Sequence, residues 1–162
     1  AASGNNRSAK SGLTYYNGVV SLDLDGTALQ RLCILMASTN AFNEAGREIT
    51  IMPNIILVKH RSNNWFTAKR LVESIADVAG AHAGVKNLYT DFTVVGNPYN
   101  DDADAWYVLQ AKKGLISLTR MPLEITYYDE PRVYGKVVQG VIRYGCAVDN
   151  FRYLAGANFS QS

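Results

Sequence analysis

Two acidic residues near the start of the chain, Asp23 and Asp25, have a type and spacing that could support catalysis. They follow residues 19–22, which read as a strand, and they precede a glycine that can make a turn. Two carboxylates on a loop after a strand, with Mg²⁺ neutralising the charge of a phosphoryl group, suit phosphoryl transfer. This string is therefore the first place in the sequence where an active site would be sought.

The letters VVSLDLDGT at residues 19–27 resemble the first motif of the haloacid-dehalogenase-type phosphatases. The resemblance implies that Asp23 is a phosphate-accepting nucleophile, that Asp25 is an acid/base and that Mg²⁺ is required. Asp101 and Asp102 would then correspond to the late acidic motif of that family. A Mg²⁺-dependent phosphatase is the enzymatic alternative for this chain.

Other features of the sequence argue against a phosphatase. Lys59 is only a loose counterpart of the family's lysine, and the late motif opens with Gly-Asn instead of Gly-Asp. Residues after 106 read as consecutive strands, whereas the phosphatase fold alternates helices with parallel strands. A simpler interpretation is that Asp25 or Thr27 caps a helix, because a short side-chain oxygen can accept hydrogen bonds from first-turn amides.

The elements that would position these carboxylates are predicted from hydrophobic periodicity. Strands are expected at 13–22, 48–51, 55–58, 87–95, 106–109, 125–128 and 136–149, and the run at 55–58 is expected to be covered on both faces. One helix is expected on a buried stripe of Ala28, Leu29, Leu32, Cys33, Leu35 and Met36. A second is expected to have Asn63 or Asn64 as its N-cap, to bury Leu71, Val72, Ile75, Val78 and Ala79, and to end at Gly80.

The strand at 136–149 places Val138, Ile142, Tyr144, Cys146 and Val148 on one face, because side chains alternate along a strand. Cys146 is therefore predicted to lie in the core.

The composition describes a chain that can fill a hydrophobic core and carries little net charge. It has 162 residues, of which 48% are hydrophobic and 19% charged, with a formal net charge of +2. This length suits one domain, or one domain with a tail. Acidic and basic residues are interspersed, so a dedicated electrostatic surface for nucleic acid is not expected. No apolar run is long enough to span a bilayer, so we expect no membrane partner.

The cysteines and histidines predict neither a metal site nor a cofactor. Cys33 and Cys146 are far apart in apolar surroundings, which argues against a disulfide framework and fits a reducing cytoplasm. His60 and His82 have no carboxylate or cysteine at ligand spacing. Residues 1–12 are small and polar, and they read as a flexible tail or as a remnant of cloning or processing.

From residue 28 onward the order of features resembles the major capsid proteins of tailed phages, and among them the Mu-like head-subunit type. The matching features are a helix at 28–36, the letters NEAGR at 43–47 and IMPNIILV at 51–58, a helix at 68–74, Asn87, residues 94–98, and AWYVL at 105–109 with the closing strands. Each motif is short and mostly apolar. Lys59 departs from the pattern, since the family often has a proline there.

The capsid resemblance implies an α+β fold of mixed helices and mostly antiparallel sheet, with residues 13–162 as a capsid-type axial domain plus part of the peripheral domain. It implies a structural, non-enzymatic subunit that assembles in the host bacterial cytoplasm into hexamers and pentamers of a DNA-filled head. Its partners would be copies of itself, scaffold or other head proteins, and packaged DNA through weak contacts. The chain would be the C-terminal portion of a coat protein, because no segment is left for the family's N-terminal arm, long hairpin and spine helix.

The resemblance and the residue types together direct attention to possible subunit contacts. Ten tyrosines supply amphipathic side chains suited to interfaces. Acidic residues at 101–104 could face basic residues of a neighbouring copy, and such pairs set register more than affinity. The predicted interface residues are Asn97, Tyr99, Asp101, Asp102, Asp104, Arg120, Arg132 and Tyr134. A DNA-binding module is a third possibility, which the balanced charge disfavours.

Overall fold

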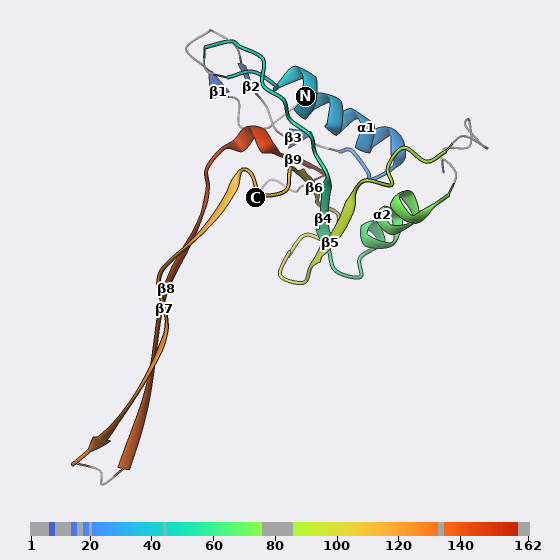
Figure 1. The fold of residues 1–162 in the computed structure, drawn as a ribbon. Helices are drawn as coiled ribbons and strands as arrows, with labels where there is room; N and C mark the ends of the chain where they lie inside the picture. The colour runs from blue at the N-terminus through green and yellow to red at the C-terminus, as the bar shows by residue number, and fades with distance from the viewer. Residues whose placement is uncertain are drawn as a thin grey trace. The chain divides into compact units, whose positions relative to one another are not determined.

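A computed structural model of the chain describes residues 7–8, 14–15, 18–19, 21–43, 45–75, 86–132 and 135–158. The chain divides into two compact units: unit 1 comprises Ala1–Gly114 and Asn150–Ser162, and unit 2 comprises Leu115–Asp149 (Figure 1). The tail or remnant predicted at 1–12 lies outside the described residues, apart from Arg7–Ser8. Arg7–Ser8 form β1, which pairs antiparallel with β2, Thr14–Tyr15.

Unit 1 is built on a five-stranded mixed sheet with the strand order β3-β9-β6-β4-β5. The strands are β3 (Gly18–Val19), β4 (Ile55–Lys59), β5 (Thr93–Asn97), β6 (Trp106–Leu109) and β9 (Leu154–Ala157). β3 runs parallel to β9 and β4 parallel to β5, whereas β6 is antiparallel to both of its neighbours. With two α-helices and the antiparallel hairpin of unit 2, the described residues confirm the predicted α+β class.

The first helix, α1, spans Gly26–Ile34 and continues as a π-helical turn, η1, at Leu35–Thr39. Its N-cap is Asp25, whose carboxylate accepts a 2.6 Å hydrogen bond from the amide of Ala28. The predicted stripe is confirmed, since Ala28, Leu29, Leu32, Leu35 and Met36 are buried and Cys33 is half-buried.

The second helix, α2, spans Asn63–Glu73, so it begins one or two residues earlier than a cap at Asn63 or Asn64 predicts. Its N-cap is Ser62, whose hydroxyl accepts a 3.2 Å hydrogen bond from the amide of Trp65. Asn63 and Asn64 are already helical, so the prediction that one of them is the cap is wrong.

The predicted apolar face of α2 is also too long. Leu71 is buried and Val72 half-buried, but the helix ends at Glu73, and Ile75 lies beyond it with 93% of its surface exposed. Residues 76–85, with the predicted end at Gly80, lie outside the described residues.

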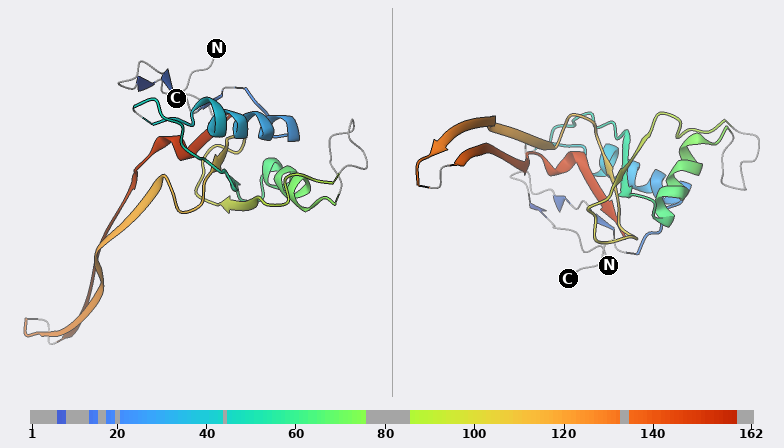
Figure 2. Two further views of the ribbon diagram at one scale, coloured as in Figure 1. Left: turned by 45° about the horizontal axis from the view of Figure 1, so that its top comes forward. Right: turned by 90° about the horizontal axis from the view of Figure 1, so that it is seen from below.

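Both helices pack on one face of the sheet, where they form the core of unit 1 (Figure 2). The inward side chains come from opposed positions of neighbouring strands: Ile56 with Val108 and Ala155, and Val58 with Trp106 and Ala157. These side chains are fully buried against the apolar stripes of α1 and α2. The indole nitrogen of Trp106 donates a 2.8 Å hydrogen bond to the carbonyl of Leu22, which satisfies its buried polar atom.

Two strand predictions in this region need correction. Residues 48–51 form no strand, because the segment makes only a single bridge between Phe42 and Glu48. β4 was predicted to be covered on both faces, but only Ile56 and Val58 are fully buried, while Ile55 and Leu57 are half-buried. The core helices among the described residues lie on one face, which accounts for the difference.

Unit 2 is a two-stranded antiparallel ribbon of β7 (Leu115–Glu130) and β8 (Gly135–Val148). The register shifts twice, between Thr119 and Met121 and between Met121 and Glu124, and both shifts add residues on β7. Pro122 lies inside the second irregularity, where a residue without an amide hydrogen is tolerated. The strand predicted at 125–128 lies within the longer β7, and the strand predicted at 136–149 corresponds to β8.

Cys146 is exposed, so its predicted place in the core is wrong. The register confirms that it shares a face of β8 with Val138, Ile142, Tyr144 and Val148, but Ile142, Tyr144 and Val148 each expose more than half of their surface. Alternation along a strand assigns a side chain to a face, and a two-stranded ribbon has no third layer that must cover that face. Among the described residues, no helix has the length and apolar character needed to cross a membrane.

Candidate functional site

The loop 97–105, which joins β5 to β6, holds five of the eight predicted interface residues: Asn97, Tyr99, Asp101, Asp102 and Asp104. The side-chain oxygen of Asn97 accepts a 3.0 Å hydrogen bond from the amide of Tyr99. A carboxylate oxygen of Asp102 likewise accepts from the amide of Asp104 at 2.9 Å. Asn and Asp side chains commonly stabilise turns by bonding to amides two residues ahead, so the loop has a defined shape.

Two side chains from distant parts of the sequence hold this loop in place. The ammonium group of Lys59, at the end of β4, donates to the carbonyl oxygen of Asp101 at 3.1 Å. The amide nitrogen of Asn64, in the first turn of α2, donates to the carbonyl oxygen of Asp104 at 2.7 Å. Both anchors use backbone oxygens, so the exposed carboxylates of Asp101 and Asp104 do not take part in them.

Two tyrosines in and beside the loop differ in their exposure to solvent. Tyr99 exposes 89% of its surface, which is unusual for an aromatic side chain. Tyr107, which follows the loop on β6, is half-buried. Burial raises the pKa of the Tyr107 phenol, and the nearby charge of Asp102 raises this pKa further. Tyr107 is thus partly covered by unit 1, whereas Tyr99 is the exposed aromatic side chain of the loop.

Just before the loop, Gly96 of β5 packs closely against residues that follow β4. A Cβ atom placed on Gly96 would lie 2.7 Å from Nδ1 of His60 and 3.2 Å from Nε1 of Trp65. The rings of His60 and Trp65 meet edge to face, with 5.7 Å between their centroids. Gly96 is therefore required by space at this point, and His60 serves in packing, in keeping with the prediction that it is an ordinary loop histidine. His82 lies outside the described residues.

The remaining predicted interface residues do not belong to this loop. Arg120 lies on β7 and Arg132 in the turn after it, and both are exposed in unit 2. Tyr134 lies outside the described residues. The eight residues are therefore distributed over two units of the chain.

The carboxylates with the spacing of a catalytic pair are both engaged in structural hydrogen bonds. Asp25 caps α1, as the simpler interpretation predicted. Asp23 accepts a 2.9 Å hydrogen bond from the side-chain amide of Asn158, just after β9. The bond between Asp23 and Asn158 joins the segment before α1 to the residue that follows β9.

The other components of a phosphatase site are not gathered around this pair. The ammonium group of Lys59 bonds to the loop carbonyl of Asp101, and Asp102 shapes the turn of that loop. Within the described part of the chain, no group of three or more His, Cys, Asp or Glu side chains could hold a metal ion. The described residues therefore offer no cluster of ligands for Mg²⁺.

Sequence reasoning missed a surface on the ribbon. Leu123, Ile125, Tyr127 and Val138 expose between 51% and 74% of their surface. The alternating pattern of the closing strands was the signal for it, but this pattern was interpreted as a core face. Exposed apolar side chains that lie together mark sites of protein interaction.

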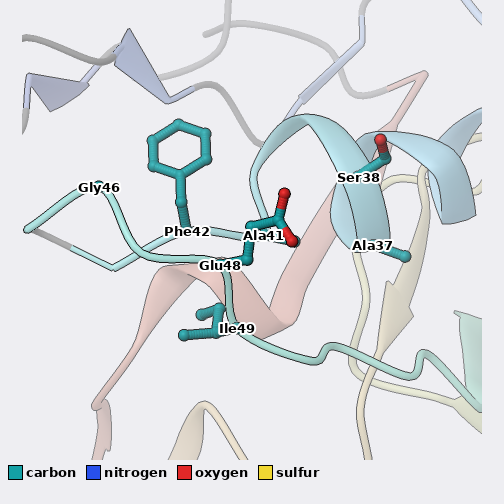
Figure 3. A pocket seen from close by; sticks show the side chains of 7 residues that line it. All are labelled: Ala37, Ser38, Ala41, Phe42, Gly46, Glu48 and Ile49. Carbon is teal, nitrogen blue, oxygen red and sulfur yellow. The ribbon is translucent and has the colours of Figure 1, made fainter.

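A hollow of about 390 Å³ lies beside the π-helical turn of unit 1 (Figure 3). Its lining residues are Ala37, Ser38, Ala41, Phe42, Gly46, Glu48 and Ile49. Ala37 and Ser38 come from η1, and the other lining residues come from the segment that follows it (Figure 3). Among the described lining residues, Glu48 is the one charged side chain.

Comparison of the sequence with models of known protein families finds no match, and comparison with curated proteins finds no relative.

Proposed function

We propose that this chain is part of the major capsid protein of a tailed phage or prophage, and that its work is to bind copies of itself. The observation that carries the proposal is the ribbon of β7 and β8, which exposes apolar side chains along most of its length. A two-stranded hairpin alone is marginally stable in water, so such a ribbon needs another protein surface. In a shell, neighbouring copies supply that surface.

The proposal includes the finer fold assignment, which is a capsid-type axial domain with part of the peripheral domain. It also includes the partners that the capsid resemblance implies. These are copies of the chain in hexamers and pentamers, scaffold or other head proteins, and packaged DNA through weak contacts. The protein would assemble in the host bacterial cytoplasm and reside in the virion.

The loop 97–105 fits a second kind of subunit contact in this proposal. Hydrogen bonds from Lys59 and Asn64 hold its backbone, and Tyr99 and the carboxylates of Asp101 and Asp104 point into the surroundings. An ordered loop loses little entropy on binding, and exposed charges select the partner and the register. Arg120 and Arg132 on the ribbon of another copy are basic partners of suitable charge.

The phosphatase alternative has no observation in its favour beyond the short string itself. Asp25 is used as a helix cap and Asp23 accepts from Asn158, so both carboxylates have structural roles. We therefore propose no second function.

Assembly of the purified chain tests the proposal. We expect chemical cross-linking of the concentrated protein to give a ladder of species that closes at five or six copies, and electron microscopy to show rings or shells. Hydrolysis of an aryl phosphate with Mg²⁺ serves as the control assay, and we expect the wild type and Asp23→Asn to be equally inactive. A protein that stays monomeric and loses a robust phosphatase activity in Asp23→Asn would contradict the proposal.

A further inference from the structure

The outer half of the ribbon has one apolar face that ends in an acid–base pair. Residues directly opposite each other in an antiparallel pair lie on the same face. Three successive rows of this face are Ile125 with Gly140, Tyr127 with Val138, and Asp129 with Lys136. Leu123 lies against the same face, because a Cβ atom on Gly140 would meet its Cδ1 at 3.7 Å. We call these seven residues the tip face.

The tip face is open to solvent. Tyr127 exposes 74% of its surface, Leu123 and Val138 each expose 60%, and Ile125 exposes 51%. Asp129 and Lys136 are also exposed. An aromatic side chain buries roughly 150–250 Å² of accessible surface in an interface. Burial of the tip face can therefore remove several hundred square ångströms of accessible surface from solvent, which is roughly half of what one partner contributes to a standard interface.

We propose that the tip face binds the tip face of a second copy, with a two-fold axis running along the ribbon between them. The inference rests on the proposed self-association and names one surface that performs it. A two-fold contact presents the same patch on both subunits, so the patch must be complementary to itself.

The rows of the tip face meet this requirement. A two-fold axis along the ribbon places β7 of one copy over β8 of the other, so each residue faces its own cross-strand partner in the second copy. Asp129 then faces Lys136 twice, once from each copy. A two-fold axis across the ribbon would instead place β7 over β7 and β8 over β8, with the two tips pointing in opposite directions. In that arrangement no acidic side chain of the tip face lies opposite a basic one. Charge therefore selects the first arrangement and selects a second copy of this chain as the partner.

The sizes of the side chains are complementary in the same arrangement. Each apolar row combines a larger side chain with a smaller one, Tyr127 with Val138 and Ile125 with Gly140. The two-fold axis places Ile125 of one copy over the space that Gly140 leaves in the other. Packing within the ribbon does not require a glycine at position 140, because an added Cβ would make only an ordinary van der Waals contact with Leu123. Its lack of a side chain is explained by the space that a partner needs.

Charge reversal in the full 162-residue chain tests the pairing. Asp129→Lys and Lys136→Asp each place like charges opposite each other across the dimer contact. We therefore expect the dimer dissociation constant of each variant alone to be about tenfold higher than that of the wild type. An equimolar mixture of the two variants pairs each introduced charge with an opposite one, and we expect it to associate like the wild type. Sedimentation velocity over a concentration series measures both effects. Glu124→Lys is the matched control, because Glu124 lies on the other face of the ribbon.

Two glycines of β8 give an independent steric test. Gly140→Val fills the space on the tip face, and we expect it to weaken association by about tenfold. Gly145→Val is the control, since Gly145 lies on the other face and a Cβ there meets nothing within 4 Å. Valine suits a strand at either position, so both variants are expected to keep the ribbon.

Each outcome decides the proposal. Restored association in the mixture, together with a larger effect of Gly140→Val than of Gly145→Val, supports it. A mixture that stays as dissociated as the single variants, equal effects of the two valines, or a wild type that is monomeric throughout would overturn it. Failure of the proposed function is seen separately: dimers without rings or shells support the tip contact alone, whereas rings that form unchanged in all three tip-face variants support a shell subunit that associates elsewhere.

Discussion

Asp25 lies at the N-terminus of α1 with a carboxylate oxygen 2.6 Å from the amide nitrogen of Ala28. Asp23, two residues earlier, accepts a hydrogen bond from Asn158. Carboxylates used in this way satisfy amide donors that would otherwise lack a partner. The acidic pair that suggested phosphoryl transfer is thus accounted for by the stability of unit 1.

Replacing Asp25 by alanine removes this cap, and we expect unit 1 to lose about 1 kcal/mol of unfolding free energy. Urea denaturation followed by circular dichroism measures the change. Asp25→Asn is the control, because asparagine is an equally good cap and should cost far less. Equal losses in the two variants would show that the cap is not the source of the stability.

Cys33 and Cys146 should differ strongly in reactivity in the folded protein. Burial raises the pKa of the Cys33 thiol to about 11, so at pH 8 only about one thiol in a thousand is ionised at this site. Cys146 is exposed on the ribbon. Mass spectrometry after brief treatment with iodoacetamide at pH 8 is expected to find the label on Cys146, and labelling of Cys33 should rise as the pH approaches 11 or when the protein is unfolded. Faster labelling of Cys33 at pH 8 would contradict the burial.

Among the elements, β5 is held by close packing against the turn between β4 and α2. Gly96 is opposite Val58 in the register, and it lies against His60 of that turn and Trp65 in the first turn of α2. The turn also supplies Ser62, the cap of α2. One contact thus positions a strand, a helix start and the loop 97–105.

Gly96→Ala is expected to destabilise unit 1 by about 1–3 kcal/mol, because the added methyl group overlaps His60 and Trp65. The double variant Gly96→Ala/His60→Ala should recover part of the loss, since it removes the nearest side-chain atom. Thermal unfolding of the two single variants and the double variant measures the coupling between the sites. If the stability losses of the two single variants simply add in the double variant, the overlap with His60 is not what destabilises Gly96→Ala.

At the level of the whole molecule, the ribbon leaves and re-enters unit 1 at neighbouring points. The amide of Asn150 donates a 3.4 Å hydrogen bond to the carbonyl of Gly114, so the two ends of the ribbon meet. Gly114 has a φ of +82°, and its added Cβ would lie 3.0 Å from the carbonyl oxygen of Asn150. Among the described residues, the core of unit 1 includes none from the ribbon.

Excising residues 115–149 and joining Gly114 to Asn150 through two glycines should therefore leave unit 1 folded. We expect its unfolding midpoint in urea to stay close to that of the full chain, while self-association is lost. Circular dichroism and sedimentation velocity measure the two properties on the same sample. Unfolding of the excised protein would show that the ribbon stabilises unit 1, and retained association would place the subunit contact in unit 1.

The local features of this protein could be read from its sequence. The stripe of α1, the cap at Asp25 and the strands β4 and β6 each depend on residues within a few positions of one another. Hydrophobic periodicity and capping chemistry act over that same short range, which is why they were predictable. The α+β class was implied by the capsid resemblance, and the described elements agree with it.

Long-range contacts settled what the sequence left open. The loop 97–105 was found from its residue types, but the anchors Lys59 and Asn64 lie about 40 residues away in the chain. Cys146 was assigned to the correct face of β8, yet whether anything covers that face depends on the number of layers packed there. Periodicity reports which way a side chain points, and burial depends on what the folded chain, or a second copy of it, brings opposite.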